Sequence, residues 1–270
     1  MKKSKKNKNK KAKIILIVIA IIIVLLLFMF MLYKALNINK KVYTRVDRTK
    51  QLQAAKRESP DTVGWLTIYD ANIDIPIITR KKARAMSTGE IGLSDYAWII
   101  NDNNKYTNKV GITGHNIINL SSNPIIDDRS YSRLENLMSF VYLDYAKSHQ
   151  YMQYTVDGKT HYYKMFAVFF SSGERNFGTM KLTNNQMKEV LDNYKKASIY
   201  DYDVDLKSTD NIIIVATCTR FFGVDSYDKT FVVVGRELRE NEKNMVEYKV
   251  AANDNYKIVE EKMKGSENNE

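Results

Sequence analysis

The sequence predicts a mostly β fold: a closed, mainly antiparallel barrel or sheet with several flanking α-helices, preceded by an N-terminal transmembrane helix. Three observations predict it. Residues 14–33 form an uninterrupted apolar run, short β-type segments separated by turn residues fill residues 63–234, and the few helical signals do not alternate regularly with the strands. A parallel doubly wound sheet needs that alternation, so we expect a mainly antiparallel arrangement.

The apolar run at residues 14–33 is twenty residues long and carries no charge. As a helix rising about 1.5 Å per residue it spans about 30 Å, the thickness of the hydrocarbon core of a bilayer. A cleaved signal peptide has a shorter apolar region followed by small residues, whereas Phe28, Met29, Phe30 and Met31 stand near the end of this run. A buried core helix of this length without a charge is the weaker alternative. The sequence therefore predicts a retained, single-pass membrane anchor.

Charge predicts the orientation of this anchor and argues against nucleic-acid binding. Residues 1–13 contain eight lysines and no acidic residue, and such cationic flanks remain on the cytoplasmic side. We therefore expect a basic cytoplasmic tail at residues 1–13 and an extracellular domain after the anchor. The formal net charge of +11 falls to +3 without those eight lysines, since 34 basic residues then face 31 acidic ones. A basic tail beside an anionic membrane leaflet needs no nucleic-acid partner.

Composition divides the exported part into three segments. Residues 34–58 are polar, lack Gly and Pro, and predict a helical linker or N-terminal helix that Ser59 and Pro60 end. Residues 59–239 contain all the strong strand signals and form the expected folded domain. Residues 240–270 are charged and nearly free of apolar runs, so we expect a charged tail that is disordered over residues 265–270.

Within the folded domain, β-branched and aromatic runs predict strands, and turn residues separate them. Asp157-Gly158 is a strong hairpin signal between two of these strands. Thr183, with Gln186 three residues later, matches a capping box that opens a helix reaching about residue 196. A second helix is expected at residues 133–140, and residues 80–94 are expected to be irregular. The predicted strands are residues 63–68, 73–78, 97–100, 110–113, 151–156, 160–170, 212–217 and 231–234.

Cys218 is the only cysteine in the sequence and follows the apolar run at residues 212–217. A single cysteine cannot form an internal disulfide, so in an exported domain its thiol remains available for chemistry. The simpler interpretation is a small side chain buried in the core, where free cysteines are common. However, threonines on both sides and the polar loop at residues 220–230 predict a position near the rim of the sheet, where functional side chains often lie.

His115 is the histidine best placed to act with this thiol. It follows a β-type run at residues 110–113, and Gly114 permits a tight or positive-φ backbone at the junction of strand and loop. His149 and His161 are expected on the surface. A thiol as nucleophile and a neighbouring histidine as general acid and base are the smallest set of side chains for nucleophilic acyl transfer. No metal site is expected, because neither close His or Cys ligands nor paired carboxylates accompany His115.

With these residues in place, the chain resembles the sortases, most closely those of class B, which are cysteine transpeptidases that join surface proteins to the cell wall of Gram-positive bacteria. The order of the motifs, the 103 residues from His115 to Cys218 and the N-terminal anchor agree with that family. The resemblance covers about residues 60–238 and implies a closed sortase-type β-barrel. The stretches that carry it are residues 60–68 and 73–77, Gly114-His115-Asn116, and residues 214–218 and 231–236.

The resemblance implies a mechanism and a set of partners. Cys218 would attack the carbonyl of a C-terminal sorting motif in a surface protein or pilin and leave a thioacyl enzyme. An amine of a peptidoglycan precursor, or a pilin lysine, would then resolve it, with His115 as general acid and base. Asn116 and Thr217 would support this pair as its neighbours. The implied partners are the substrate protein, the amine acceptor and the cell membrane, without nucleic acid, cofactor or metal.

The sequence departs from the family at the arginine that holds the substrate and the developing oxyanion. Thr230 stands where that arginine is expected, directly before the final strand, with Lys229 beside it. Arg220, two residues after Cys218, would share its face if the strand continued; a solvated loop residue is an equal alternative. Arg236 lies beyond the final strand, six residues after Thr230, and is expected to be too far away. The third member is therefore Arg220, Lys229 as a point charge, or absent.

Two other functions stay open on sequence grounds. The missing arginine favours a sortase-like protein that binds sorting motifs, or assists pilus assembly, without turnover. An exported cysteine peptidase, in which water resolves the thioester, would need the same Cys218 and His115. The leading expectation is a membrane-anchored cysteine transpeptidase, because the motifs occur in the order that is typical of that family.

Overall fold

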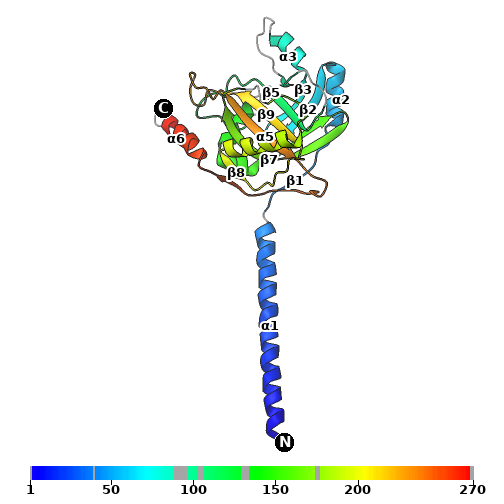
Figure 1. The fold of residues 1–270 in the computed structure, drawn as a ribbon, viewed down its shortest axis with the longest axis vertical. Coiled ribbons are helices and arrows are strands. Elements are labelled where there is room, and N and C mark those ends of the chain that lie inside the picture. Colours follow the sequence, from blue (N-terminus) through cyan, green and yellow to red (C-terminus); the bar gives the residue numbers. More distant parts are fainter. Residues whose placement is uncertain are drawn as a thin grey trace. The chain divides into compact units, whose positions relative to one another are not determined.

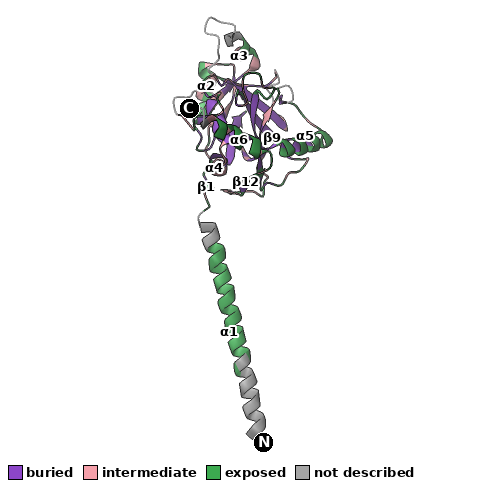
Figure 2. Ribbon diagram, turned by 90° about the vertical axis from the view of Figure 1, so that its left-hand side faces the viewer, coloured by how far each residue is buried: buried purple, intermediate pink, exposed green. Residues whose placement is uncertain are grey.

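A computed structural model describes residues 2–38, 40–87, 96–101, 106–128, 134–173 and 177–267. The chain divides into two compact units, Met1–Lys41 and Val42–Glu270. Helix α1 (Lys2–Ile38) belongs to the first unit. Its segment Ile15–Lys34 has a mean hydropathy of 3.6 and is long and apolar enough, by length and composition, to cross a membrane. Figure 2 shows this part of α1 exposed along its length, which would be unfavourable for such side chains in water.

The second unit is built on a closed barrel of eight strands, in the order β10-β7-β6-β2-β3-β4-β5-β9 (Figure 1). The pairs β3–β4 and β5–β9 are parallel, and the other neighbours are antiparallel. The predicted mostly β, closed barrel with flanking helices is therefore confirmed. The barrel strands are β2 (Thr62–Ile68), β3 (Ile73–Ile78), β4 (Ala97–Ile99), β5 (Lys109–Gly114), β6 (Tyr151–Val156), β7 (Lys159–Ser171), β9 (Ile212–Cys218) and β10 (Thr230–Glu237).

Local turn and capping chemistry explains two of the predicted elements. Asp157 and Gly158 have φ values of 49° and 75°, and positive φ at both central residues is what a two-residue hairpin between β6 and β7 requires. At the start of α5 (Asn184–Ala197), the Gln186 amide donates to Thr183 Oγ1 at 3.4 Å, and the Thr183 amide donates to Gln186 Oε1 at 2.9 Å. Both the hairpin and the capping box were predicted, and both are confirmed.

Two helical regions differ from expectation. The segment expected to be irregular begins with α3 (Arg80–Ser87), because its Arg, Lys, Ala and Met residues favour helix and Thr79 Oγ1 accepts the amide of Lys82 at 3.1 Å; residues 88–94 lie outside the described residues. The helix expected at residues 133–140 is a 3₁₀ helix, η1 (Glu135–Val141), followed by α4 (Leu143–Ser148). Residue 133 lies outside the described residues.

The segments that flank the barrel in sequence also fold onto it. Residues 34–58 contain the end of α1, then β1 (Val42–Tyr43) and α2 (Thr49–Glu58), which packs on β2. The expected charged tail contains β11 (Met245–Val246), β12 (Val250–Ala252) and α6 (Tyr256–Glu267). Strand β11 pairs with β1, and β12 pairs with β8 (Tyr200–Tyr202).

The folded structure of the tail was missed because its apolar residues occur only in groups of at most three between polar and charged residues. Met245, Val250 and Val259 are each buried, although each stands in a group of only two or three apolar residues. Residues 265–267, expected to be disordered, lie in α6, and residues 268–270 lie outside the described residues. Such short apolar groups give no clear periodic signal, and their burial depends on segments that are distant in sequence.

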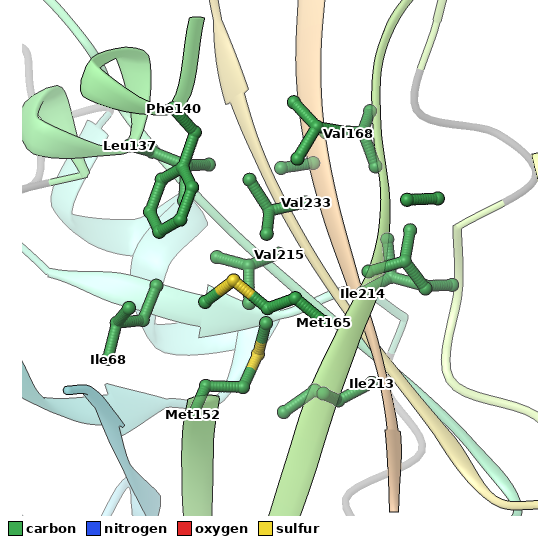
Figure 3. Packing of buried hydrophobic residues seen from close by; sticks show 14 of the residues in the cluster. Ile68, Leu137, Phe140, Met152, Met165, Val168, Ile213, Ile214, Val215 and Val233 are labelled. Atoms are coloured by element: carbon green, nitrogen blue, oxygen red, sulfur yellow. The ribbon is translucent and has the colours of Figure 1, made fainter. Parts of the chain in front are cut away.

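The core holds the central strands in register. Val215 on β9 and Val233 on β10 are register partners, and Figure 3 shows them in a cluster with Phe140, Met152 and Met165. All residues of β9 are buried except the last one, Cys218. Burying a large aliphatic side chain contributes about 1.5–3 kcal/mol. The core therefore fixes β9 firmly and leaves Cys218 at its exposed end.

Candidate active site

The register of three neighbouring strands brings the predicted site residues to one end of the barrel. On the parallel pair β5–β9, Gly114 is the partner of Thr217. His115 directly follows Gly114, and Cys218 directly follows Thr217, so the two leave the barrel on adjacent strands, which lie about 4.8 Å apart. Strand β10 begins at the same end, where Thr230 is the antiparallel partner of Cys218.

Threonine hydroxyls tie β5 to β9 immediately below this end. Thr217 Oγ1 donates to the carbonyl of Gly114 at 2.8 Å, and Thr113 Oγ1 donates to the carbonyl of Ala216 at 3.0 Å. Both threonines are buried, so these hydrogen bonds are shielded from water. They fix the last residues of the two strands that carry His115 and Cys218. Cys218 itself is exposed and therefore does not fill a core position.

His115 is half-buried and packs against an aromatic side chain that the sequence did not single out. The ring of Trp98 on β4 lies 5.0 Å from the imidazole, centroid to centroid, at an interplanar angle of 57°. Gly114 has no positive φ, so the positive-φ alternative was wrong. Its role is close packing: a Cβ there would lie 3.2 Å from the side chain of Leu134 and 3.3 Å from the Cα of Ala97.

Asn116 connects the histidine loop to the cysteine strand. Its buried Nδ2 donates to the carbonyl of Cys218 at 3.1 Å and to the carbonyl of Asn119 at 2.6 Å, while its Oδ1 accepts the amide of Asn119 at 3.0 Å. Asn119 Nδ2 in turn donates to the carbonyls of Ile125 and Glu135, each at 3.0 Å. Asn119 was missed because only its buried position, and not any motif, indicates this role.

A cavity of about 420 Å³ opens beside the cysteine. Arg220 and Lys229 line it and are exposed, whereas Thr230 is buried next to it. Backbone hydrogen bonds fix the walls of the cavity. The Arg220 amide donates to the carbonyl of Leu120 at 3.1 Å, and the Thr219 amide donates to the carbonyl of Lys229 at 2.9 Å. The residues that line this cavity are Asn116, Leu120, Cys218, Thr219, Arg220, Val224 and Lys229.

Comparison with known proteins shows which sequences and structures this chain resembles. No family model matches the chain. Sortase B of Listeria monocytogenes is 26% identical over 202 residues, which cover 66% of this chain and 74% of the relative. This similarity supports a homologue of the class B sortases. This homology supports a sortase transpeptidase.

Solved sortase B structures share the fold of this homologue. The Staphylococcus aureus sortase B–substrate complex matches with a TM-score of 0.55 and 14% identity, over 78% of this chain and 92% of that one. Clostridium perfringens sortase B matches with a TM-score of 0.53 and 19% identity, over 69% of this chain and 99% of that one. The barrel of this chain is therefore the sortase-type barrel that the resemblance implied.

Within this sortase homologue, the cationic candidates separate by position. Arg236 lies at the opposite end of β10, where it is the partner of Ile212, is fully buried and forms an ion pair with Glu242. It is therefore far from the cysteine, as expected. Arg220 and Lys229 lie at the cysteine end and line its cavity. Thr230, at the position expected for the arginine, offers one buried hydroxyl next to Cys218.

The other two histidines are structural. His161 was expected on the surface, but it is buried, with Nδ1 bonded to Glu237 Oε1 at 2.6 Å and its ring stacked 3.8 Å from that of Tyr106. His149 is half-buried and stacks on Tyr145 at 3.7 Å. Among the residues that the structure describes, no three His, Cys, Asp or Glu side chains form a group that could hold a metal ion.

Proposed function

We propose that this sortase homologue is a membrane-anchored cysteine transpeptidase with Cys218 as nucleophile and His115 as general acid and base. The observation that supports the proposal is the register of β5 and β9, in which the residues directly before His115 and Cys218, Gly114 and Thr217, are partners at one barrel end, with Cys218 exposed beside a cavity. A structural cysteine would need neither the exposure nor the neighbouring histidine.

The chemistry follows from these two side chains. The Cys218 thiolate attacks the carbonyl carbon of a sorting motif, and a C–S bond forms as the peptide C–N bond breaks. His115 gives its proton to the leaving amine. It then takes a proton from the incoming amine, whose attack forms a new C–N bond and releases the thiolate. The substrate would be the sorting motif of a surface protein or pilin, and the acceptor an amine of a cell-wall precursor or a pilin lysine.

Arg220 is the proposed donor to the oxyanion that develops on the attacked carbonyl. It lines the cavity of Cys218, two residues after the nucleophile, and its guanidinium can donate two parallel hydrogen bonds. Such preorganised donors typically contribute about 10²–10³ in rate. Asn116 and Thr217 are the proposed positioning residues, because their hydrogen bonds fix the ends of the two strands.

The test is a covalent intermediate on Cys218. A peptide that carries a sorting motif should add the mass of its acyl part to the wild-type chain, and Cys218→Ala should abolish the adduct. The Ala variant should keep its thermal melting temperature, since the side chain is exposed. An adduct that persists in Cys218→Ala would rule out this nucleophile.

Two other functions are separated by the same experiment. Thr230 at the arginine position favours a protein that binds sorting motifs without turnover, and such a protein would form no thioester. A cysteine peptidase would form the thioester but release a free acid whether or not an amine is present. A transpeptidase should give the amide product, in an amount that rises with amine concentration.

We also propose that α1 anchors the chain with its lysine-rich end in the cytoplasm and the barrel outside. Protease added to cells stripped of their wall should then digest residues 59–239 and spare the span Ile15–Lys34. Complete protection of the barrel would show the opposite orientation.

A further inference from the structure

We propose that the cavity of Cys218 contains a carboxylate-binding subsite made by Lys229, with Arg220 beside it. The inference rests on the proposed function, because it names a chemical group that the same site selects. The ligand group would be a carboxylate that one of the two substrates places next to the reacting carbonyl.

The first observation is the sign of the charge in the cavity. Among the described residues that line it, Arg220 and Lys229 are the charged ones, and both are cations. Asp225 and Asp228 lie in the same loop and are exposed, but they do not line the cavity. A cavity with charge of one sign concentrates ligands of the opposite sign.

The second observation is that no carboxylate of the described residues pairs with these cations. In the described part of the chain, neither Arg220 nor Lys229 makes an ion pair. Other arginines of this unit form ion pairs: Arg239 pairs with Asp205 and Asp210, and Arg48 pairs with Asp74. Among the described residues, no carboxylate therefore neutralises these two cations at the cavity where the acyl group would bind.

The third observation is the character of the remaining wall. Leu120 and Val224 add apolar surface beside the two cations, and Val224 is 60% exposed. The Lys229 carbonyl accepts the Thr219 amide at 2.9 Å, so the backbone that carries this lysine is fixed to the cysteine strand. Apolar surface lowers the local dielectric, which strengthens a contact between an ammonium and a carboxylate.

The experiment uses two reagents of nearly equal size that differ in charge. Iodoacetate and iodoacetamide both alkylate a thiolate, with formation of an S–C bond and loss of iodide, and Cys218 is the only cysteine in the chain. The measurement is the rate of alkylation by iodoacetate divided by the rate of alkylation by iodoacetamide. This ratio for the folded chain is then divided by the same ratio for the chain unfolded in urea. At low salt we expect this normalised ratio to be about 5, because the cations attract the negatively charged reagent.

Variants assign the effect to the subsite. Lys229→Gln should bring the normalised ratio close to one, Lys229→Glu should bring it below one, and Lys229→Arg should keep it. Lys207→Gln is the matched control, because Lys207 is also exposed but lies at the opposite end of β9, and it should leave the ratio unchanged. Raising the salt to about 1 M, where the Debye length is about 3 Å, should reduce the wild-type ratio.

A normalised ratio of one in the wild type, or one that Lys229→Gln leaves unchanged, would overturn the proposal. Neither result depends on turnover, so a failure of the proposed function would show separately as the absence of a thioester on Cys218.

A second measurement identifies which substrate supplies the carboxylate. Binding to Cys218→Ala is compared for sorting-motif peptides with Asp or Asn at each position beside the cleaved bond, and for triglycine against triglycinamide. Preference for Asp assigns the carboxylate to the sorting motif, and preference for triglycine assigns it to the acceptor. Equal affinities in both comparisons would overturn the subsite.

Discussion

The charged groups at the two ends of the strand pair β9–β10 have opposite environments: buried and paired at one end, exposed at the other. At the end where β9 begins, Arg236 is fully buried and paired with Glu242, and Glu237 accepts hydrogen bonds from Asn211 at 2.6 Å and Tyr106 at 3.0 Å. At the end where β9 finishes, Cys218 and Arg220 are exposed. The same two strands therefore have one closed, ion-paired end and one open end.

This difference shows how a single barrel separates stability from chemistry. A buried charge must be paired, since its desolvation costs several kcal/mol, and the partners at the closed end remove that cost. The open end leaves its thiol and its cations accessible, so they can act on a substrate. Changes at the open end should alter rates with little effect on folding, and changes at the closed end should do the reverse.

The largest effect is expected from His115→Ala at the open end. Loss of general acid–base catalysis typically costs about 10²–10⁴ in rate, and this histidine serves both halves of the proposed reaction. Single-turnover acylation and transfer rates measure the effect, with His149→Ala as a control that changes a histidine away from the cavity. Acylation close to wild type by a folded His115→Ala chain would contradict the assignment.

At the closed end, Glu242→Ala should lower the free energy of unfolding by about 3 kcal/mol, because it removes the closer of the two carboxylates paired with the buried Arg236 guanidinium and leaves only Asp205, at 3.6 Å. Urea denaturation measures it. Asp192→Ala, which breaks the exposed pair with Lys188 on α5, should change the stability little. If Glu242→Ala instead slowed acylation in a chain of unchanged stability, the separation of the two ends would be wrong.

Arg220→Ala should reduce the acylation rate by about 10²–10³ and leave the melting temperature nearly unchanged. The loss should exceed that of Lys229→Ala or Thr230→Val, measured with one peptide under single-turnover conditions. Should Arg220→Ala acylate normally, the oxyanion would have to depend on Thr230, Lys229 or backbone amides near Cys218.

A smaller effect is expected from Asn116→Ala, which removes the hydrogen bonds to the carbonyls of Cys218 and Asn119. Leaving buried partners unsatisfied costs about 1–3 kcal/mol. We expect the acylation rate to fall about tenfold, with a matching fall in melting temperature and little change in KM. Full rate with reduced stability would make Asn116 structural alone.

The smallest effect concerns pH and should distinguish the two ends again. Burial alone would raise the pKa of Glu242, but hydrogen bonds from Arg236 and Lys164 lower it to about 2. Because this is below the unfolded value of about 4.3, its stabilisation is complete above that value and is lost as the pH falls towards 2.

The stability difference between wild type and Glu242→Gln should therefore stay constant from about pH 7 to 5 and shrink at lower pH. Denaturation series at each pH measure it, and a constant difference down to pH 2.5 would contradict the pKa shift. Arg220→Ala should show no such change over the same range.

Much of the fold could be predicted because its signals are local. The hairpin at Asp157-Gly158, the capping box at Thr183 and the apolar run of β9 each depend on a few adjacent residues, and each occurs as predicted. The mistakes also have local causes. His161 stands among polar and aromatic neighbours, and Val259 belongs to a single apolar pair with Ile258 between lysine and glutamate residues, so neither shows its burial in sequence.

The sequence by itself determined the apolar span, the strands of a mostly β domain, the pair of candidates His115 and Cys218, and the resemblance to class B sortases. The tertiary structure decided the parallel register of β5 and β9, the closed end around Arg236, and the cavity lined by Arg220 and Lys229. The physical reason is the separation along the chain of the residues that interact. Turns, caps and periodicity act between neighbours in the chain, whereas strand register and cavity lining depend on contacts between segments about 100 residues apart.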